Sequence, residues 1–262
     1  MLKAAADILI RRCSSVKPIH RIDCFEVLHM RWKRKWVLFY VLTILSVLAA
    51  SWWGSRTATV IAENSAITRK HRIIIDPGHG GMDGGATSCT GKTESSYNLE
   101  ISQRLNALLQ LMGYQTYMVR TADTSVHTKG ETIAQKKASD LKERVRIANE
   151  TENSILLSIH QNHFSDSRYS GSQVFYAGTE GSKELAIQLQ SAFQSALGQS
   201  PNRQVKKSDG IYLMEHIRCP GVLIECGFLS NTQEEAKLRD PAYQKKLCCV
   251  IASTVNQHLS NT

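Results

Sequence analysis

Short apolar runs alternate with amphipathic helical patterns from about residue 71 to the end of this chain, and this alternation limits the possible folds more than any other feature. The apolar runs have the length and the Val, Ile and Leu content of buried strands. In chain order they are HRIIID, YQTYMVR, SILLSIH, SQVFY and GVLIEC. Strands that alternate with helices favour a parallel sheet covered on both faces. We therefore predict an α/β fold, a single domain with a central, mostly parallel mixed sheet of about five to six strands flanked by helices on both faces.

The predicted helices carry apolar residues three or four positions apart. A glycine follows the last apolar position of the first and of the second long helix, at Gly113 and Gly198, and glycine is a common helix end. Pro241 suits the first turn of the last helix. Residues 121–137 are polar and show no helical period, so we predict a long loop there, followed by a short helix capped by Ser139.

Eighteen residues from Trp36 to Trp53 carry no charge, and they follow the basic cluster RWKRK. This pattern is typical of a signal anchor or a signal peptide whose basic end stays in the cytoplasm, and a buried core helix is the less favoured alternative. We predict a basic cytoplasmic N-terminus over 1–35, a membrane segment over 36–53, a tether over 54–70 and an exported domain over 71–262.

The fate of the membrane segment has two readings. Small residues at Ala49 and Ala62 would suit a signal peptidase, whereas Trp52 and Trp53 suit the interface of a retained anchor. A signal sequence normally begins with its basic region, and here that region begins at Met30. We therefore hypothesise that Met30 is the initiator and that 1–29 is an upstream extension. A native protein that contains Cys13 would contradict this hypothesis.

The net charge of +9 does not indicate nucleic-acid binding, because it is concentrated at one end. Residues 1–36 hold nine Lys or Arg against three Asp or Glu, which gives +6 there and leaves +3 for the rest. An exported domain with so small an excess has no basic stripe for a phosphate backbone. Five of the seven cysteines follow the membrane segment. Their odd number and the lack of a CxxC pair argue against a disulfide framework.

Four polar residues stand where parallel strands end or where the first long helix begins. They are His79, Glu94, His160 and Glu225. Ligands of open α/β sheets bind beyond the carboxyl ends of the strands. Two imidazoles and one carboxylate are a usual ligand set of catalytic zinc, and a further carboxylate can take a proton from water.

Each of these residues also has an ordinary structural explanation. A single histidine after a strand is often only hydrogen-bonded, and Glu94 could simply favour the helix dipole. Glu225 is harder to explain in this way because its neighbours in GVLIEC are apolar, so its carboxylate must be paired, metal-bound or protonated. A thiol nucleophile, Cys226 with His79 or His160 as base, is an alternative that leaves both glutamates without a role.

The glycine-rich stretch IIIDPGHGGMDGGATS is not a nucleotide-binding loop. Asp83 stands where a dinucleotide fingerprint needs its third glycine, and no Lys-Ser or Lys-Thr pair follows, as a phosphate loop requires. We expect its glycines to turn His79 back over the edge of the sheet.

Five motifs in a fixed order resemble the zinc-dependent N-acetylmuramoyl-L-alanine amidases of the type 3 amidase family, over roughly 71–259. The motifs are DPGHGGMDGGA, TGKTE, LKERVRIAN, LLSIHQNHF and GVLIECGFLSN. Two further stretches are similar to the germination-specific members of spore-forming bacteria. They are ETIAQKKASDLKERV and QVKKSDGIYLMEH.

The resemblance implies that His79, Glu94 and His160 hold one Zn²⁺ and that Glu225 is the catalytic carboxylate. The implied substrate is peptidoglycan, cleaved between N-acetylmuramic acid and the L-alanine of the stem peptide. Asn162 and Lys206, expected on loops at the rim of the site, are candidate substrate contacts, with an ordinary surface role as the alternative. His163 stands where a small residue is common and could compete as a ligand, but strand alternation favours His160.

For the germination-specific members, the resemblance further implies action on the spore cortex, on the cell-wall side of the membrane or in the intermembrane space of the forespore. A partner deacetylase would then convert the product glycan to muramic-δ-lactam. Several amidases of this kind resemble switched enzymes whose loops control access to the site, and the residues leave open whether this chain is active alone or needs an activating partner protein. Two alternatives are a non-catalytic peptidoglycan-binding protein of the same fold and a zinc carboxypeptidase that cuts within the stem peptide.

Overall fold

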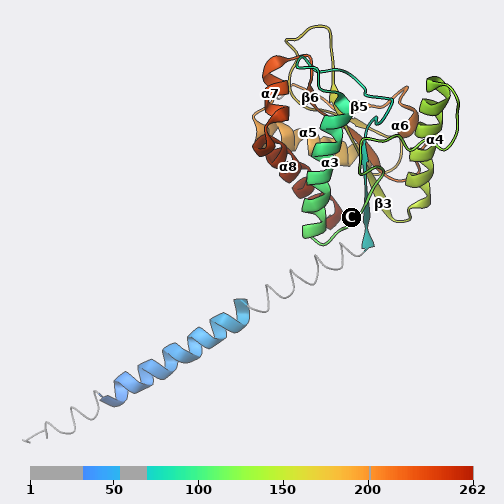
Figure 1. The fold of residues 1–262 in the computed structure, drawn as a ribbon. Coiled ribbons are helices and arrows are strands. Elements are labelled where there is room, and N and C mark those ends of the chain that lie inside the picture. The colour runs from blue at the N-terminus through green and yellow to red at the C-terminus, as the bar shows by residue number, and fades with distance from the viewer. Residues whose placement is uncertain (1–31, 54–69, 201, 262) are drawn as a thin grey trace, which may run out of the picture. The chain divides into compact units, whose positions relative to one another are not determined.

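The computed structural model describes residues 32–53, 70–200 and 202–261 (Figure 1). The chain forms two compact units, Met1–Val60 and Ile61–Thr262. In the first unit, a helix over Trp32–Trp53 is long and apolar enough to cross a membrane, and its apolar side chains are exposed. This helix is consistent with the predicted anchor or signal segment. Most of the predicted cytoplasmic N-terminus and of the tether, over 1–31 and 54–69, lies outside the described residues.

The second unit is built on a six-stranded sheet in the order β2-β1-β3-β6-β4-β5. The strands are β1 (Arg72–Pro77), β2 (Gln115–Met118), β3 (Ser154–Asn162), β4 (Gln173–Tyr176), β5 (Lys206–Lys207) and β6 (Gly221–Phe228). All neighbours run parallel except β4 and β6, which pair antiparallel. The predicted mostly parallel mixed sheet is confirmed.

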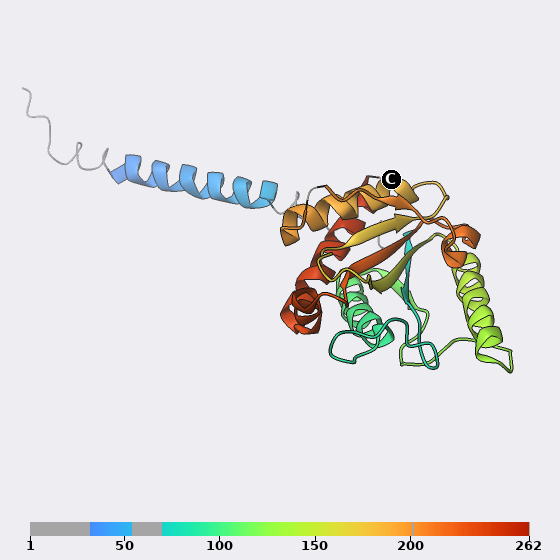
Figure 2. The same cartoon turned by 90° about the horizontal axis from the view of Figure 1, so that it is seen from above.

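Helices cover both faces of this sheet, as Figure 2 shows. They are α3 (Glu94–Leu111), α4 (Ile133–Glu150), α5 (Ser182–Leu197), α6 (Tyr212–His216), α7 (Thr232–Arg239) and α8 (Pro241–Ser260). The helices α3, α5 and α8 pack over one core, whereas α4 and α6 enclose a smaller core on the other face. Strand β1 contributes residues to both cores: Ile73 and Ile75 pack in the first, and Ile74 packs in the second. A strand buried on both faces must be apolar throughout, which explains its run of three isoleucines.

The prediction for the start of α4 was wrong. The helix begins at Ile133, and Thr132 is its N-cap in a reciprocal capping box with Gln135. Ser139 lies inside the helix, where its hydroxyl accepts hydrogen bonds from the backbone N–H groups of Thr128 (3.1 Å) and Lys129 (3.2 Å). The predicted loop is therefore shorter than expected, and its last part is fixed to the helix.

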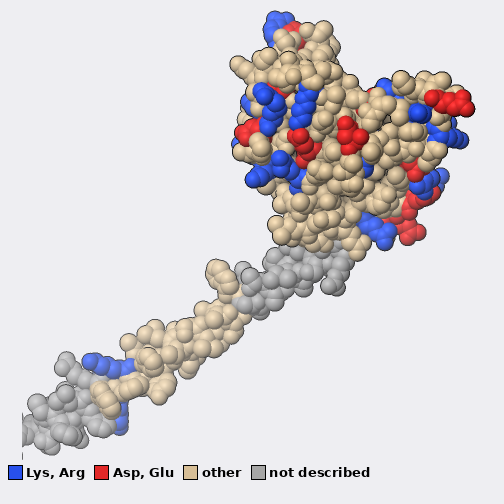
Figure 3. Space-filling model, in the orientation of Figure 1, with Lys and Arg blue, Asp and Glu red and all other residues tan. Residues whose placement is uncertain are grey.

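Charged side chains of both signs are interspersed on the face of the second unit seen in Figure 3. No extended basic stripe crosses that face. The distribution agrees with the small excess of positive charge that the sequence gives to this part of the chain.

Candidate metal centre

Three of the predicted site residues come together where β1 and β3 end and α3 begins. His79 follows β1 by two residues, Glu94 is the first residue of α3, and His160 lies near the end of β3. One potential ligand atom from each lies within 4.8 Å of the other two. Residues that are separated by up to 81 positions in the sequence thus share one site because parallel strands place their carboxyl ends at one edge.

The carboxylate of Glu94 lies between the two imidazole rings. Its Oε1 is 2.9 Å from Nδ1 of His160, and its Oε2 is 3.2 Å from Nε2 of His79. Backbone N–H groups of Ala86 (3.0 Å) and Gln161 (3.2 Å) also donate to it. Burial opposes ionisation, yet the histidine contacts hold the pKa of Glu94 far below its usual value.

The environment of His79 also favours positive charge. Burial acts to lower its pKa, but hydrogen bonds and charge interactions with Glu94 and Asp83 raise the pKa of His79 to about 9. The carboxylates that favour this proton would also favour a metal cation, which would take the place of the proton on Nε2. Two imidazole nitrogens and a carboxylate are donors that zinc prefers. The residues present therefore fit a zinc ion.

The fourth predicted residue, Glu225, lies beside the cluster. It is the Cα partner of His160 in the β3–β6 pairing, so both side chains occupy the same face of the sheet. Among the described residues, Glu225 Oε2 is buried and has no hydrogen-bond partner. Burial raises the pKa of Glu225 to about 7, with His160 acting in the opposite direction. A carboxylate with this pKa can accept and release a proton near neutral pH.

The glycine-rich loop leaves no room for side chains at two positions around the cluster. A Cβ atom at Gly78 would lie 2.1 Å from Nε2 of His160, and one at Gly85 would lie 2.5 Å from Oε2 of Glu94. His79 itself has a positive φ of 60°, which is uncommon outside glycine. The glycines are therefore required by close approach to the ligand residues, as expected for the turn around His79.

Two buried arginines hold the carbonyl groups of this strained loop. Arg144 of α4 donates to the oxygens of Pro77 (3.0 Å) and His79 (2.7 Å). Arg120 donates to the oxygens of Pro77 and Gly78, both at 2.9 Å. Three successive carbonyls of the loop thus have a charged donor, which offsets the cost of an unusual backbone conformation.

The charge of Arg144 is balanced by Asp76 at the end of β1 and by Asp140 on its own helix. Arg144 forms a buried ion pair with Asp76, and its Nε donates to Asp140 at 2.5 Å. Asp76 also accepts from the hydroxyl of Ser158 at 2.7 Å. Burial opposes its ionisation, but Arg144 and Ser158 hold the pKa of Asp76 below its usual value. Sequence reasoning missed this network, although Arg144 lies in the inward-facing part of α4.

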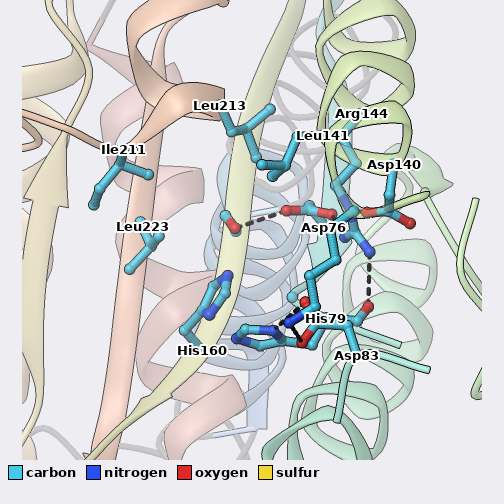
Figure 4. A pocket seen from close by; sticks show the side chains of 13 residues that line it. Asp76, His79, Asp83, Asp140, Leu141, Arg144, His160, Ile211, Leu213 and Leu223 are labelled. Atoms are coloured by element: carbon cyan, nitrogen blue, oxygen red, sulfur yellow. Dashed lines mark hydrogen bonds and ion pairs between the residues drawn. The ribbon is translucent and has the colours of Figure 1, made fainter. Parts of the chain in front are cut away.

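A pocket of about 210 Å³ opens beside the cluster (Figure 4). His79 and His160 line one side of it, and the Asp76–Arg144 pair lies on another. Four apolar side chains form part of the wall, and four further polar ones, including two from α4, complete it. The apolar residues are Leu141, Ile211, Leu213 and Leu223, and the polar ones are Asp83, Lys137, Asp140 and Ser158. The pocket lies next to the cluster, on the α4 and α6 face of the sheet.

The other residues singled out in the sequence lie outside the cluster. His163 is exposed beyond the end of β3, and the group of three suited to a metal in the described residues contains His160 instead. Asn162 is half-buried at the end of β3, and Lys206 is exposed on the edge strand β5. Neither lines the pocket, and their roles as substrate contacts stay predictions. Cys226 is fully buried in the core on the opposite face, which argues against a thiol nucleophile.

Comparison with known proteins points to a single family. The family model described as N-acetylmuramoyl-L-alanine amidase matches residues 73–257. The germination-specific N-acetylmuramoyl-L-alanine amidase of Bacillus subtilis is 36% identical over 225 residues, which cover 85% of this chain and 93% of that protein.

Solved structures agree with this result. The CwlD amidase from Clostridioides difficile, determined in complex with the GerS lipoprotein, matches with a TM-score of 0.70 and 36% identity, over 74% of this chain and 100% of that chain. An N-acetylmuramoyl-L-alanine amidase from Clostridium difficile 630 matches with a TM-score of 0.63 and 32% identity, over 72% of this chain and 96% of that chain.

Proposed function

The chain belongs to the N-acetylmuramoyl-L-alanine amidase family, and we propose that its peptidoglycan amidase activity depends on a zinc ion held by His79, Glu94 and His160. The convergence of these three side chains beside the buried carboxylate of Glu225 is the observation that carries the proposal. A bound zinc ion would activate water and polarise the carbonyl of the scissile amide. The amide joins the lactyl group of N-acetylmuramic acid to L-alanine.

The protein's own groups would handle the protons of the reaction. Glu225 accepts a proton from the attacking water at its buried carboxylate, because no other hydrogen bond in the described structure occupies Oε2. It then delivers this proton to the nitrogen of L-alanine as the amide bond breaks. The products are a free lactyl carboxyl group on the glycan and a stem peptide with a free amine. Asp76, Arg120 and Arg144 keep His79 in place during these steps through the backbone of its loop.

Product analysis tests the reaction directly. The purified full chain, loaded with zinc, is incubated with peptidoglycan, and the products are identified by mass spectrometry. We expect intact stem peptides that begin with L-alanine, with their cross-links preserved, and glycan strands without peptides. Shortened peptides still attached to muramic acid would instead show a carboxypeptidase. Binding to peptidoglycan without any cleavage would show a non-catalytic protein of the same fold.

The biological role that we propose is maturation of the spore cortex and hence germination. Its support is the 36% identity with the germination-specific amidase over nearly all of that protein. Chemistry agrees with this role, because a lactam on muramic acid needs a free lactyl carboxyl group and a free amine. The amidase supplies the carboxyl group, and a partner deacetylase would supply the amine. Deletion of the gene in the native organism should give spores without muramic-δ-lactam, and a normal lactam content would contradict this role.

We further propose that the protein is exported across the cytoplasmic membrane and acts with a partner protein. Peptidoglycan lies outside the cytoplasmic membrane, and the apolar helix over Trp32–Trp53 is a candidate signal or anchor for delivery to that side. In a sporulating cell this would be the intermembrane space of the forespore. The relative in complex with a lipoprotein supports a search for an activating partner of this chain. Repeating the product analysis after co-expression with candidate lipoproteins addresses that point.

A further inference from the structure

The two ring nitrogens of His79 face different carboxylates. Nε2 lies 3.2 Å from Oε2 of Glu94, within the cluster of three. Nδ1 lies on the other side of the ring, 3.0 Å from Oδ2 of Asp83. A neutral imidazole has one N–H donor and one acceptor nitrogen, and a carboxylate can only accept. With a metal ion between Nε2 and Glu94, Asp83 would be the remaining acceptor for the ring, so it would keep the proton on Nδ1 and leave the lone pair of Nε2 directed at the metal.

Asp83 is itself fixed from two directions. Its second oxygen, Oδ1, lies 2.8 Å from Nζ of Lys137 on α4. Its backbone pairs with Gly80 through two hydrogen bonds, at 2.8 and 3.2 Å, which set the position of the Cα atom without using the side chain. Both carboxylate oxygens thus have a partner among the described residues, and the contact with Lys137 favours the orientation that faces His79.

We propose that Asp83 and Lys137 are positioning residues that set the tautomer and ring orientation of His79 for the metal. The inference rests on the proposed function, since it assumes that His79 is a zinc ligand. A carboxylate that accepts from the far nitrogen of a ligand histidine raises the basicity of the nitrogen facing the metal. Lys137 holds that carboxylate in place. The contacts from His79 to Asp83 and from Asp83 to Lys137 thus connect the proposed metal centre to α4. Arg144 of the same helix donates to the backbone of the His79 loop.

Because the side chains of Asp83 and Lys137 are partly exposed, an experiment can distinguish a positioning role from a structural role. The Asp83 side chain is 27% exposed and that of Lys137 is 48% exposed, so neither lies in a core. Replacing either removes little buried surface, and the backbone pairing of Asp83 with Gly80 is retained. The metal-free protein should therefore lose only a partly exposed ion pair, a small effect beside the change in zinc affinity.

The experiment compares Asp83→Asn, Lys137→Met and a control, Lys142→Met, in the full chain purified in mild detergent. Lys142 is an exposed lysine on the same helix. Zinc affinity is measured by competition with a chromogenic chelator, and thermal unfolding is measured without metal. We expect about 10- to 100-fold weaker zinc binding for Asp83→Asn, a smaller loss for Lys137→Met and none for Lys142→Met. Unfolding of the metal-free proteins should change little, and excess zinc should restore zinc occupancy in both weakened variants and amidase activity in Asp83→Asn.

The outcomes separate this inference from the proposed function. If the unchanged chain binds no zinc, the proposed metal centre itself is wrong. If it binds zinc and Asp83→Asn binds equally well, only the positioning role is wrong. A lower unfolding temperature of metal-free Asp83→Asn with unchanged zinc affinity would show a structural role instead. Should Asp83→Asn fail to fold, a Lys137→Met affinity equal to that of Lys142→Met would overturn the inference.

Discussion

Replacing Glu225 with glutamine should leave zinc bound and lower the rate of stem-peptide release by about 10²- to 10⁴-fold, the usual contribution of a general acid–base group. Glutamine has nearly the same shape as glutamate but cannot accept a proton. The three residues suited to the metal do not include Glu225. The pKa of about 7 that burial gives this carboxyl group suits proton transfer near neutral pH. Zinc content by elemental analysis and product release by mass spectrometry measure the two effects.

Two results would contradict this assignment of Glu225. Activity within tenfold of the unchanged chain would show that another group moves the proton. Loss of zinc together with activity would show that Glu225 is a ligand. Thermal unfolding of the variant serves as the control for folding, because the buried Oε2 atom has no hydrogen-bond partner that glutamine would break.

Much of the fold and the core of the site could be predicted because both depend on local patterns. Strand β1 is buried on both faces, so its sequence is a continuous apolar run. His79 and His160 lie at the ends of such runs, where parallel strands place ligand-binding residues. Predicting that Glu225 lies beside His160 also requires the register between β3 and β6, and the apolar patterns of the strands do not contain this register.

The supporting residues could not be found in this way because they act over long sequence separations. Arg144 contacts Asp76 across 68 positions, and Arg120 contacts Gly78 across 42. Their partners include backbone carbonyls, which leave no mark on the residue types around them. The start of α4 is a different case, because Thr132 followed by Gln135 is a capping-box pattern that the sequence does contain. The long polar segment before it obscured that signal.

Replacing His160 with alanine should abolish zinc binding and amidase activity together, whereas replacing His163 with alanine should change neither. The two histidines are three residues apart, yet only His160 belongs to the cluster with His79 and Glu94. Removing a ligand should weaken zinc binding by more than the roughly 10- to 100-fold expected from loss of a residue that only orients one. Chelator competition and product analysis on the same preparations measure both quantities.

His163 is a stringent control because sequence alone leaves it in competition with His160. The bulge between His160 and Asn162 shifts the register at the end of β3, so simple alternation along the strand does not decide the matter there. Instead, the contact between His160 Nδ1 and Glu94 Oε1 at 2.9 Å selects His160. Zinc loss in the His163 variant would show that the end of β3 rearranges when metal binds. Retention of zinc in the His160 variant would reject the three-residue centre and, with it, the division of roles between the ligands and Glu225.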